Sequence, residues 1–293
     1  DVTVYPKNQT GKPTLEKTVR EDKNSTGKNT GSLTDIADGY AHTATASVGD
    51  VVEYQIISTL PTITSKATSL TTYTFVDTLR EGIRYNRSDV VIEFFRDAGC
   101  TDQITAWDED SGKFAVSYDD AQNTMTIGMT ETGLADINES ASFYTDSVKR
   151  GYSDCTMRIT YTATLTAGAQ LGDSDNPNEV VLTWKRTNTG YFDTLQDCCH
   201  VYTYGVDVLK QFSDGKGDLT SVNFLLHNDT DGYFVTAELV DGVYHVTGHE
   251  VKESKATAFV PNGEGHIRVM GLENDTYTLT ETDTDKGYVL MKD

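Results

Sequence analysis

The sequence predicts an all-β protein with two tandem immunoglobulin-like β-sandwich domains, and three observations support this prediction. Apolar residues recur with the period of about 2 that is typical of strands, not the period of about 3.6 that is typical of helices. Clusters of Gly, Asn and Asp separate these short runs, as turns separate antiparallel strands. A helix is expected only at residues 130–140, which favours antiparallel sandwiches over a parallel sheet with crossover helices.

The first set of strands extends to about residue 184. Four of its runs alternate apolar and polar residues, and they lie at residues 52–56, 73–79, 114–118 and 159–163. A further apolar run at residues 180–184 is followed by a polar break at residues 185–199. We expect this break to end the first group of strands.

A second set of short strands begins after the break, within VYTYGVDVLKQF. We therefore place a domain boundary near residue 203. This division gives an N-terminal segment of residues 1–11, a larger sandwich of residues 12–203 and a smaller sandwich of residues 204–293. Both sandwiches are of ordinary domain size.

The charge of the chain excludes several kinds of partner. Its 293 residues include 24 Lys and Arg against 45 Asp and Glu, for a formal net charge of −21. Such a surface repels phosphate backbones and acidic lipid headgroups, and no run of basic residues provides a local exception. No apolar stretch reaches the roughly 18 residues of a membrane span. We expect neither nucleic acid nor membrane as a partner.

The motifs of enzymes and metal sites are missing from the sequence. The six His residues form no H-E-x-x-H, and no G-x-S-x-G is present. The acidic segments DDAQN, DSDNPN and SDGKGD do not match the calcium loop D-x-[DN]-x-[DN]-G, and solvated turns explain them better. We expect no turnover enzyme, no cofactor and no metal site.

The four cysteines, Cys100, Cys155, Cys198 and Cys199, leave two interpretations open. An even number is compatible with two disulfides, one or none. The spacing fits no zinc site, because the only close pair is directly adjacent. Disulfides and buried free thiols both remain candidates.

Several polar residues lie at strand positions that the alternation turns toward the core. Alternate residues of a strand share one face, and this places Lys17, Asp77 and Asn178 on the apolar faces of their strands. In the smaller sandwich, Lys210 and Glu281 are in phase with apolar residues in the same way. A shift of one residue in register would turn all of these side chains outward to solvent.

One chemistry uses a buried amine, acid and carboxamide together. Burial disfavours both charged forms, so a core Lys beside a core acid can exist as a neutral amine next to a carboxylic acid. The amine is then a nucleophile, and the acid can polarise an Asn carbonyl and transfer protons. The amine would displace ammonia and leave a Lys–Asn isopeptide bond, in a single autocatalytic event.

Two terminal motifs add a resemblance to a known family. VYPKN contains Lys7, and YTLTETDTDKGY contains Glu281. These segments resemble the pilin motif and the E-box of the major shaft pilins of Gram-positive bacteria, which sortases assemble. The segments VGDVVEYQI, MRITYTATL and YGVDVLKQF are also similar to strands of that family, so the resemblance covers essentially the whole chain.

The resemblance implies a Cna-A-like domain followed by a Cna-B-like domain. It implies a cross-link between Lys17 and Asn178 assisted by Asp77, with Asn176 as the alternative Asn. It also implies that Lys7 accepts the C-terminal Thr of the next subunit.

The partners implied by the resemblance are other copies of the same pilin and a pilin-specific sortase. The location would be a pilus on the cell surface, anchored to the cell wall. A surface adhesin that binds a host glycan or protein is the alternative, since sandwiches present Tyr- and Asn-rich loops at their ends.

The sequence departs from the family pattern in its last part. The Asn partner of the second domain usually lies on a last strand beyond GY, but the sequence ends at GYVLMKD, and no LPXTG-like sorting signal is present. We therefore expect the smaller sandwich to lack its last strand. The roles of Lys210 as a cross-linking residue and Glu281 as its assisting acid are conditional on that strand.

Overall fold

The computed structural model describes residues 11–21, 39–64, 66–139, 151–172 and 174–290. These residues form three six-stranded sheets, which confirms the prediction of a predominantly β fold. The α-helix expected near residues 130–140 is α1 (Glu131–Glu139). Within the described ranges, no helix is long and apolar enough to cross a membrane.

The first sheet has the strand order β1-β3-β10-β6-β7, and β5 also pairs with β10. Its strands are β1 (Glu16–Glu21), β3 (Val51–Thr59), β5 (Ile83–Tyr85), β6 (Val91–Phe95), β7 (Gln103–Trp107) and β10 (Thr156–Leu165). Buried and partly exposed residues alternate strictly along β3. One face of this sheet therefore lies against the core.

The second sheet has the order β2-β12-β11-β4-β9-β8. Its strands are β2 (Thr43–Thr45), β4 (Leu70–Leu79), β8 (Phe114–Asp119), β9 (Thr124–Met129), β11 (Asn176–Arg186) and β12 (Asp193–Tyr202). Among the described strands of this sheet, only the short pairing of β2 with β12 is parallel. We refer to the first and second sheets together as the N-terminal sheet pair.

Strand β12 corrects the predicted polar break at residues 185–199. Its residues from Asp193 to Cys198 are exposed or partly exposed, so they lack an apolar alternation. The strand forms because it pairs in register with β11, from Trp184 opposite Asp193 to Asn176 opposite Val201. Backbone hydrogen bonding to a central strand defines this element, and the side-chain pattern does not reveal it.

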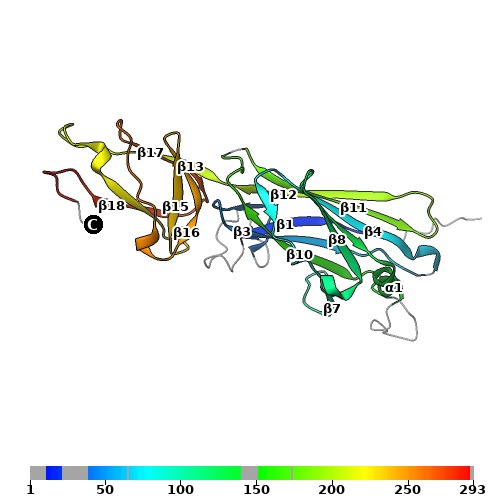
Figure 1. The fold of residues 1–293 in the computed structure, drawn as a ribbon. Coiled ribbons are helices and arrows are strands. Elements are labelled where there is room, and N and C mark those ends of the chain that lie inside the picture. The colour runs from blue at the N-terminus through cyan, green and yellow to red at the C-terminus, as the bar shows by residue number, and fades with distance from the viewer. Residues whose placement is uncertain (1–10, 22–38, 65, 140–150, 173, 291–293) are drawn as a thin grey trace, which may run out of the picture.

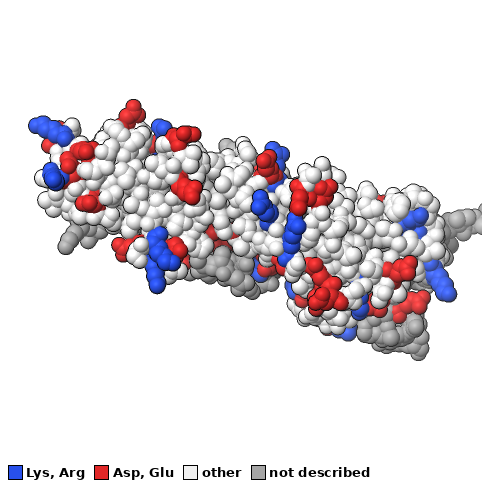
Figure 2. Space-filling model, viewed as in Figure 1, with Lys and Arg blue, Asp and Glu red and all other residues white. Residues whose placement is uncertain are grey.

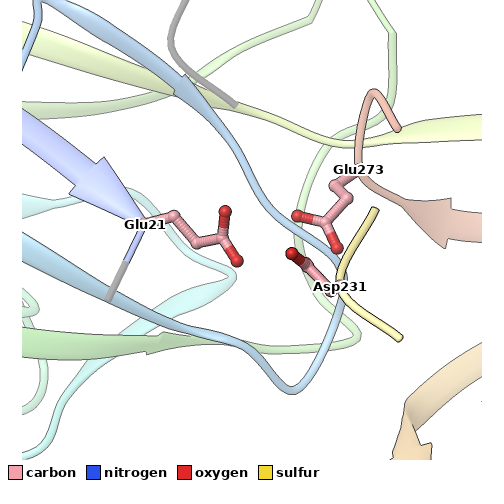
Figure 3. Close-up of side chains that lie close together, drawn as sticks. All are labelled: Glu21, Asp231 and Glu273. Atoms are coloured by element: carbon pink, nitrogen blue, oxygen red, sulfur yellow. The ribbon is translucent and has the colours of Figure 1, made fainter. Parts of the chain in front are cut away.

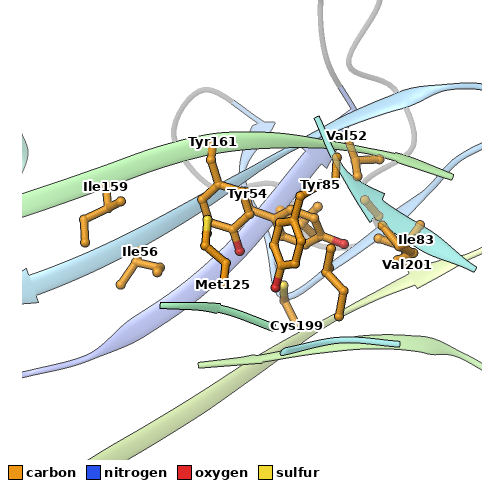
Figure 4. Packing of buried hydrophobic residues seen from close by; sticks show 14 of the residues in the cluster. Val52, Tyr54, Ile56, Ile83, Tyr85, Met125, Ile159, Tyr161, Cys199 and Val201 are labelled. Carbon is orange, nitrogen blue, oxygen red and sulfur yellow. The ribbon is translucent and has the colours of Figure 1, made fainter. Parts of the chain in front are cut away.

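Aromatic rings fill much of the space between the paired sheets. Tyr54 stacks on Tyr161 with ring centroids 5.5 Å apart, and Tyr85 lies 5.9 Å from Tyr161. Figure 4 shows these tyrosines among aliphatic side chains, Met125 and Cys199. The core is thus apolar apart from the tips of a few polar side chains.

The third sheet consists of strands that follow residue 203, in the order β13-β17-β16-β15-β14-β18. These are β13 (Tyr204–Leu209), β14 (Asn223–Asn228), β15 (Tyr233–Val240), β16 (Val243–Glu250), β17 (His266–Leu272) and β18 (Tyr277–Asp283). Strands β13 and β18 are its two edges, and residues from both edges line a groove of about 260 Å³. We call this third sheet the C-terminal sheet.

The C-terminal sheet is joined to one end of the N-terminal sheet pair (Figure 1). The Val48 backbone N–H donates to the Gly271 carbonyl at 2.9 Å, and the Glu273 N–H donates to Ser47 Oγ at 3.0 Å. Gly271 has a φ of +97°, and a Cβ there would lie 2.8 Å from Val48. Close backbone contact therefore fixes the junction. The molecule as a whole is elongated (Figure 1).

Acidic and basic side chains are intermixed on the face shown in Figure 2.

Candidate functional site

The candidate site is a polar cluster inside the N-terminal sheet pair, formed by Lys17, Asp77 and Asn178. All three side chains are fully buried, with 0% exposure. Lys17 Nζ lies 2.7 Å from Asp77 Oδ2. A buried charge is tolerated only when it is paired, and this ion pair meets that requirement.

Strand register places the acid and the carboxamide side by side. Asn178 lies opposite Leu79 on β4, and Asp77 lies opposite Val180 on β11. Asp77 and Asn178 are therefore close neighbours on the inner face of the second sheet. Lys17 comes from β1 at the edge of the first sheet, so the cluster joins the two sheets across the core.

Tyr161 on β10 connects the amine to the carboxamide. Lys17 Nζ donates a hydrogen bond to the Tyr161 hydroxyl, and Asn178 Nδ2 donates to the same oxygen at 2.8 Å. On the other side of the acid, the Tyr85 hydroxyl donates to Asp77 Oδ1 at 2.8 Å. Each oxygen of the Asp77 carboxylate thus has its own hydrogen-bond donor.

The carboxamide oxygen of Asn178 is the atom that the cluster leaves unsatisfied. Asn178 Oδ1 is buried and has no hydrogen-bond partner among the described residues. An unpaired buried acceptor costs about 1–3 kcal/mol.

Burial also fixes the protonation of the tyrosines around the cluster. Desolvation is the main cause that raises the pKa of Tyr161 far above its ordinary value, and the nearby Asp77 charge raises it further. The same two causes raise the pKa of Tyr85. Both hydroxyls therefore keep their protons, and Tyr85 remains a donor to Asp77.

Asn176, the alternative carboxamide, has a different environment. Its Oδ1 accepts from the Gln170 N–H at 2.8 Å, and its Nδ2 donates to the carbonyls of Gln170 and Val201 at 3.0 and 3.1 Å. Asn176 is fully engaged with the backbone and is held as a structural residue. The geometry favours Asn178 as the partner of Lys17.

In the C-terminal sheet, the structure brings Lys210 and Glu281 together but does not bury them. Lys210 Nζ lies 2.8 Å from Glu281 Oε2, and their side chains are 20% and 18% exposed. The prediction that this face is a core face is wrong for β13, where Val206 is 42% exposed. The reason is that no described segment covers the groove between β13 and β18, and strand alternation does not reveal whether a face is covered.

Of the remaining sequence candidates, Cys199 lies opposite Asn178 on the neighbouring strand β12. Lys7 is outside the described residues. Cys100, Cys155, Cys198 and Cys199 all carry free thiols. Cys198 and Cys199 cannot approach each other, because successive residues of β12 point to opposite faces, one exposed and one buried. Of the four thiols, only those of Cys155 and Cys199 are buried.

The sequence interpretation missed the tyrosines of the cluster. Tyr161 and Tyr85 are in phase with aliphatic neighbours on β10 and β5, so they resemble ordinary core residues. A buried tyrosine hydroxyl normally requires a partner, and this is the signal that could have indicated them.

No family model matches the chain. The chain is 24% identical over 284 residues to the trypsin-resistant surface T6 protein of Streptococcus pyogenes serotype M6, covering 87% of this chain and 45% of that protein. The chain thus spans less than half of this curated relative.

Solved structures of backbone pilins share the fold. The major pilin GBS80 of Streptococcus agalactiae, a 35 kDa C-terminal fragment, matches with a TM-score of 0.66 and 17% identity, over 97% of this chain and 90% of that fragment. The T6 backbone pilin of S. pyogenes matches with a TM-score of 0.59 and 18% identity, over 96% and 50%. The pilus backbone RrgB of Streptococcus pneumoniae gives 0.59 and 14%, over 96% and 92%. The fold of this chain is that of Gram-positive backbone pilins.

Proposed function

We propose that this chain is a structural shaft subunit of a covalently polymerised pilus on the surface of a Gram-positive bacterium. The fold shared with backbone pilins over nearly the whole chain supports this role. The observation that carries the proposal is the fully buried cluster of Lys17, Asp77 and Asn178. In this role the protein turns over no substrate, and the isopeptide bond that it forms within itself stabilises its own fold.

We propose a division into two tandem immunoglobulin-like domains, Cna-A-like at residues 12–203 and Cna-B-like at residues 204–293. The direct succession of β12, which ends at Tyr202, and β13, which begins at Tyr204, supports this boundary. The sheet pair on one side and the separate C-terminal sheet on the other support it as well.

The proposed bond joins Lys17 Nζ to the side-chain carbonyl carbon of Asn178. Proton transfer from the ammonium to Asp77 yields a neutral amine beside a carboxylic acid. The amine attacks the Asn178 carbonyl carbon while the Asp77 proton moves to the carbonyl oxygen. A new C–N bond forms and a tetrahedral intermediate results.

The intermediate collapses with Asp77 as the proton carrier. Asp77 takes one of the two protons on the former Lys17 amine and delivers it to the leaving nitrogen of Asn178. The old C–N bond breaks and ammonia leaves, while the proton on the former carbonyl oxygen returns to Asp77 and the carbonyl re-forms as an isopeptide. The acid is regenerated, so the reaction occurs once in each molecule and consumes no cofactor.

We further propose that Lys7 is the acceptor through which a sortase joins successive subunits. It lies in VYPKN, ahead of the first strand, and the Pro before it fixes φ and favours an extended segment. In such a filament, tension enters each subunit near its N-terminus. The Lys17–Asn178 bond would then carry the load directly from β1 to β11.

The mass of the denatured, reduced protein tests the cross-link. Each isopeptide bond removes one ammonia, about 17 Da, which reduction does not restore. We expect the wild type to show one such deficit, with peptide mapping that joins Lys17 to Asn178. Lys17→Ala and Asp77→Ala should show the full mass, whereas Lys210→Ala, the matched control, should keep the deficit.

An unmodified wild-type mass would contradict the cross-link and leave an adhesin as the leading alternative. A deficit that survives in Asp77→Ala would contradict the role of the acid. The acceptor role is tested separately, by incubating the protein with a pilin sortase and a donor peptide that carries an LPXTG-like sorting signal: a conjugate should form with the wild type and not with Lys7→Ala.

A further inference from the structure

A second cluster of carboxylates lies where the C-terminal sheet meets the N-terminal sheet pair. Glu21 is the last residue of β1, Asp231 lies in the turn between β14 and β15, and Glu273 directly follows β17. One carboxylate oxygen from each of the three lies within 4.8 Å of the other two. Figure 3 shows the three side chains directed toward one another. The acids come from segments far apart in the sequence, so our expectation of no metal site, drawn from local motifs, did not consider them.

Two of these acids are buried with an oxygen that nothing satisfies. Glu21 and Glu273 are each 3% exposed. Glu21 Oε2 and Glu273 Oε2 have no hydrogen-bond partner among the described residues. Burying a polar oxygen without a partner is unfavourable, so a ligand that accepts the lone pairs of these two atoms would stabilise the site.

The other oxygen of Glu273 explains how its carboxylate is held. Glu273 Oε1 accepts from the Tyr233 hydroxyl at 2.6 Å and from Asn228 Nδ2 at 3.1 Å. Ser47 Oγ, from the N-terminal sheet pair, lies 3.4 Å from the same oxygen. These donors fix one side of the carboxylate, so Oε2 is presented to Glu21 and Asp231.

Neither Glu21 nor Glu273 forms an ion pair with a Lys or Arg in the described part of the chain. Asp50 adds a further buried acid nearby, and His249 Nδ1 lies 3.3 Å from Asp50 Oδ1. Burial and the neighbouring carboxylates raise the pKa of Glu21 to about 10 and that of Glu273 to about 9.

We propose that Glu21, Asp231 and Glu273 bind a divalent cation, with Ca²⁺ as the preferred ion. The donors are all carboxylate oxygens, which are the ligands of hard cations, whereas zinc and copper sites use His or Cys. Ca²⁺ takes oxygens at about 2.3–2.6 Å, so two ligands on opposite sides are about 5 Å apart. The observed separations fit that limit.

The position of the ion would give it a structural role. Glu21 belongs to the first sheet, whereas Asp231 and Glu273 belong to the C-terminal part. A shared cation would therefore connect the two parts of the chain and fix the angle between them. The three acids are separate from Lys17, Asp77 and Asn178, so binding of the ion does not require the proposed cross-link.

Binding of Ca²⁺ to chelator-treated protein tests this proposal. We expect a saturable 1:1 heat in titration calorimetry with CaCl₂, and a rise in Tm of about 5 °C at 100 times the Kd. Tb³⁺ should bind in place of Ca²⁺ and luminesce on tyrosine excitation, because Tyr233 contacts Glu273 at 2.6 Å. Glu21→Gln and Asp231→Asn should each weaken binding at least tenfold.

The matched control is Glu238→Gln, which removes an exposed acid from β15 and should bind Ca²⁺ as the wild type does. In EDTA, Glu21→Gln should be at least as stable as the wild type, because it removes a repelled carboxylate, and this separates lost binding from misfolding. Absence of heat and of any Tm change with both Ca²⁺ and Mg²⁺ would overturn the proposal in favour of a protonated cluster. Undiminished binding in Glu21→Gln and Asp231→Asn would also overturn it.

Discussion

At the scale of single residues, the reactive amine is held in place before any bond forms. Lys17 Nζ lies 4.8 Å from the centre of the Tyr54 ring and 4.5 Å from that of Tyr161. Aromatic faces attract a cation, and Asp77 pairs with it on a further side. A long, flexible side chain is thus confined to one position, which reduces the entropic cost of reaching Asn178.

We predict that Tyr161→Phe slows cross-linking without preventing folding. The substitution removes the hydroxyl that accepts from both Lys17 Nζ and Asn178 Nδ2 but keeps the ring in the core. If the loss of these two hydrogen bonds raises the barrier by about 1.4 kcal/mol, the reaction becomes about tenfold slower. The loss of ammonia is followed by mass spectrometry as unmodified protein refolds from denaturant.

Tyr73→Phe is the control for this measurement. Tyr73 is also a buried tyrosine on an inner strand face, but its hydroxyl pairs with Ser58 at 2.7 Å. It should cross-link at the wild-type rate. Equal rates in the two variants would show that Tyr161 has no positioning role.

At the scale of strands, alternation and register account for what could be predicted. The period of two on β1, β4 and β11 placed Lys17, Asp77 and Asn178 in the core, and the structure confirms their burial. Their mutual contact could not be derived from local pattern, since it depends on which strands face each other. Tyr161 escaped prediction because an inward tyrosine resembles any core aromatic residue.

Alternation did not predict strands that form through backbone pairing, and it did not predict whether the apolar face of a strand is covered by another part of the chain. Strand β12 has no apolar alternation over its first residues and exists through its pairing with β11. On β13, alternation identified the face of Lys210 correctly, but that face borders an uncovered groove. The acids of the junction come from three separate segments, so only the tertiary structure brings them together.

The Lys210–Glu281 pair between the edge strands should contribute little to stability. Both side chains are about one fifth exposed, at 20% and 18%, so water screens their attraction. Ion pairs open to solvent contribute about 0–1 kcal/mol. We expect Glu281→Gln to lower Tm by less than about 3 °C in a thermal melt of this chain.

The reference for that prediction is Glu250→Gln, which breaks the more exposed pair with Lys255. Its effect should be smaller than that of Glu281→Gln. A loss of 10 °C or more in Glu281→Gln would show that the pair behaves as a buried ion pair.

At the scale of the whole molecule, the junction should make stability depend on pH. The folded-state pKa values of Glu21 and Glu273, about 10 and 9, lie above the ordinary value of 4.5. The folded state therefore binds more protons than the unfolded state between these values, and stability should fall as pH rises from about 4.5 to about 9. Asp50, Asp231 and Asp275 face the same cluster, and His249, whose pKa is raised by Asp50, acts in the same direction.

Thermal melts in EDTA at several pH values measure this dependence. We expect Tm to decrease across that window in the wild type and to decrease less in Glu21→Gln. Ca²⁺ should flatten the wild-type profile, since a bound cation replaces the protons. A Tm that rises with pH in EDTA would contradict the assigned direction.

The elongated arrangement of the molecule makes its response to force the final test of the shaft role. When the chain is pulled from its ends, tension that reaches Lys17 would pass through the isopeptide to Asn178 and bypass the residues between them. Those residues would span roughly 56 nm if fully extended, at about 3.5 Å per residue. We expect single-molecule traces of the wild type to lack this extension, and those of Lys17→Ala to show it.

The C-terminal sheet serves as an internal reference in the same traces. It lies beyond Asn178 and, in this chain, is not spanned by the proposed bond, so it should extend in both proteins. Residues between Asn178 and the C-terminal sheet, including most of β11 and β12, should also remain extensible in both. A full extension of the N-terminal sheet pair in the wild type would mean that the buried cluster does not carry load, whatever its chemistry.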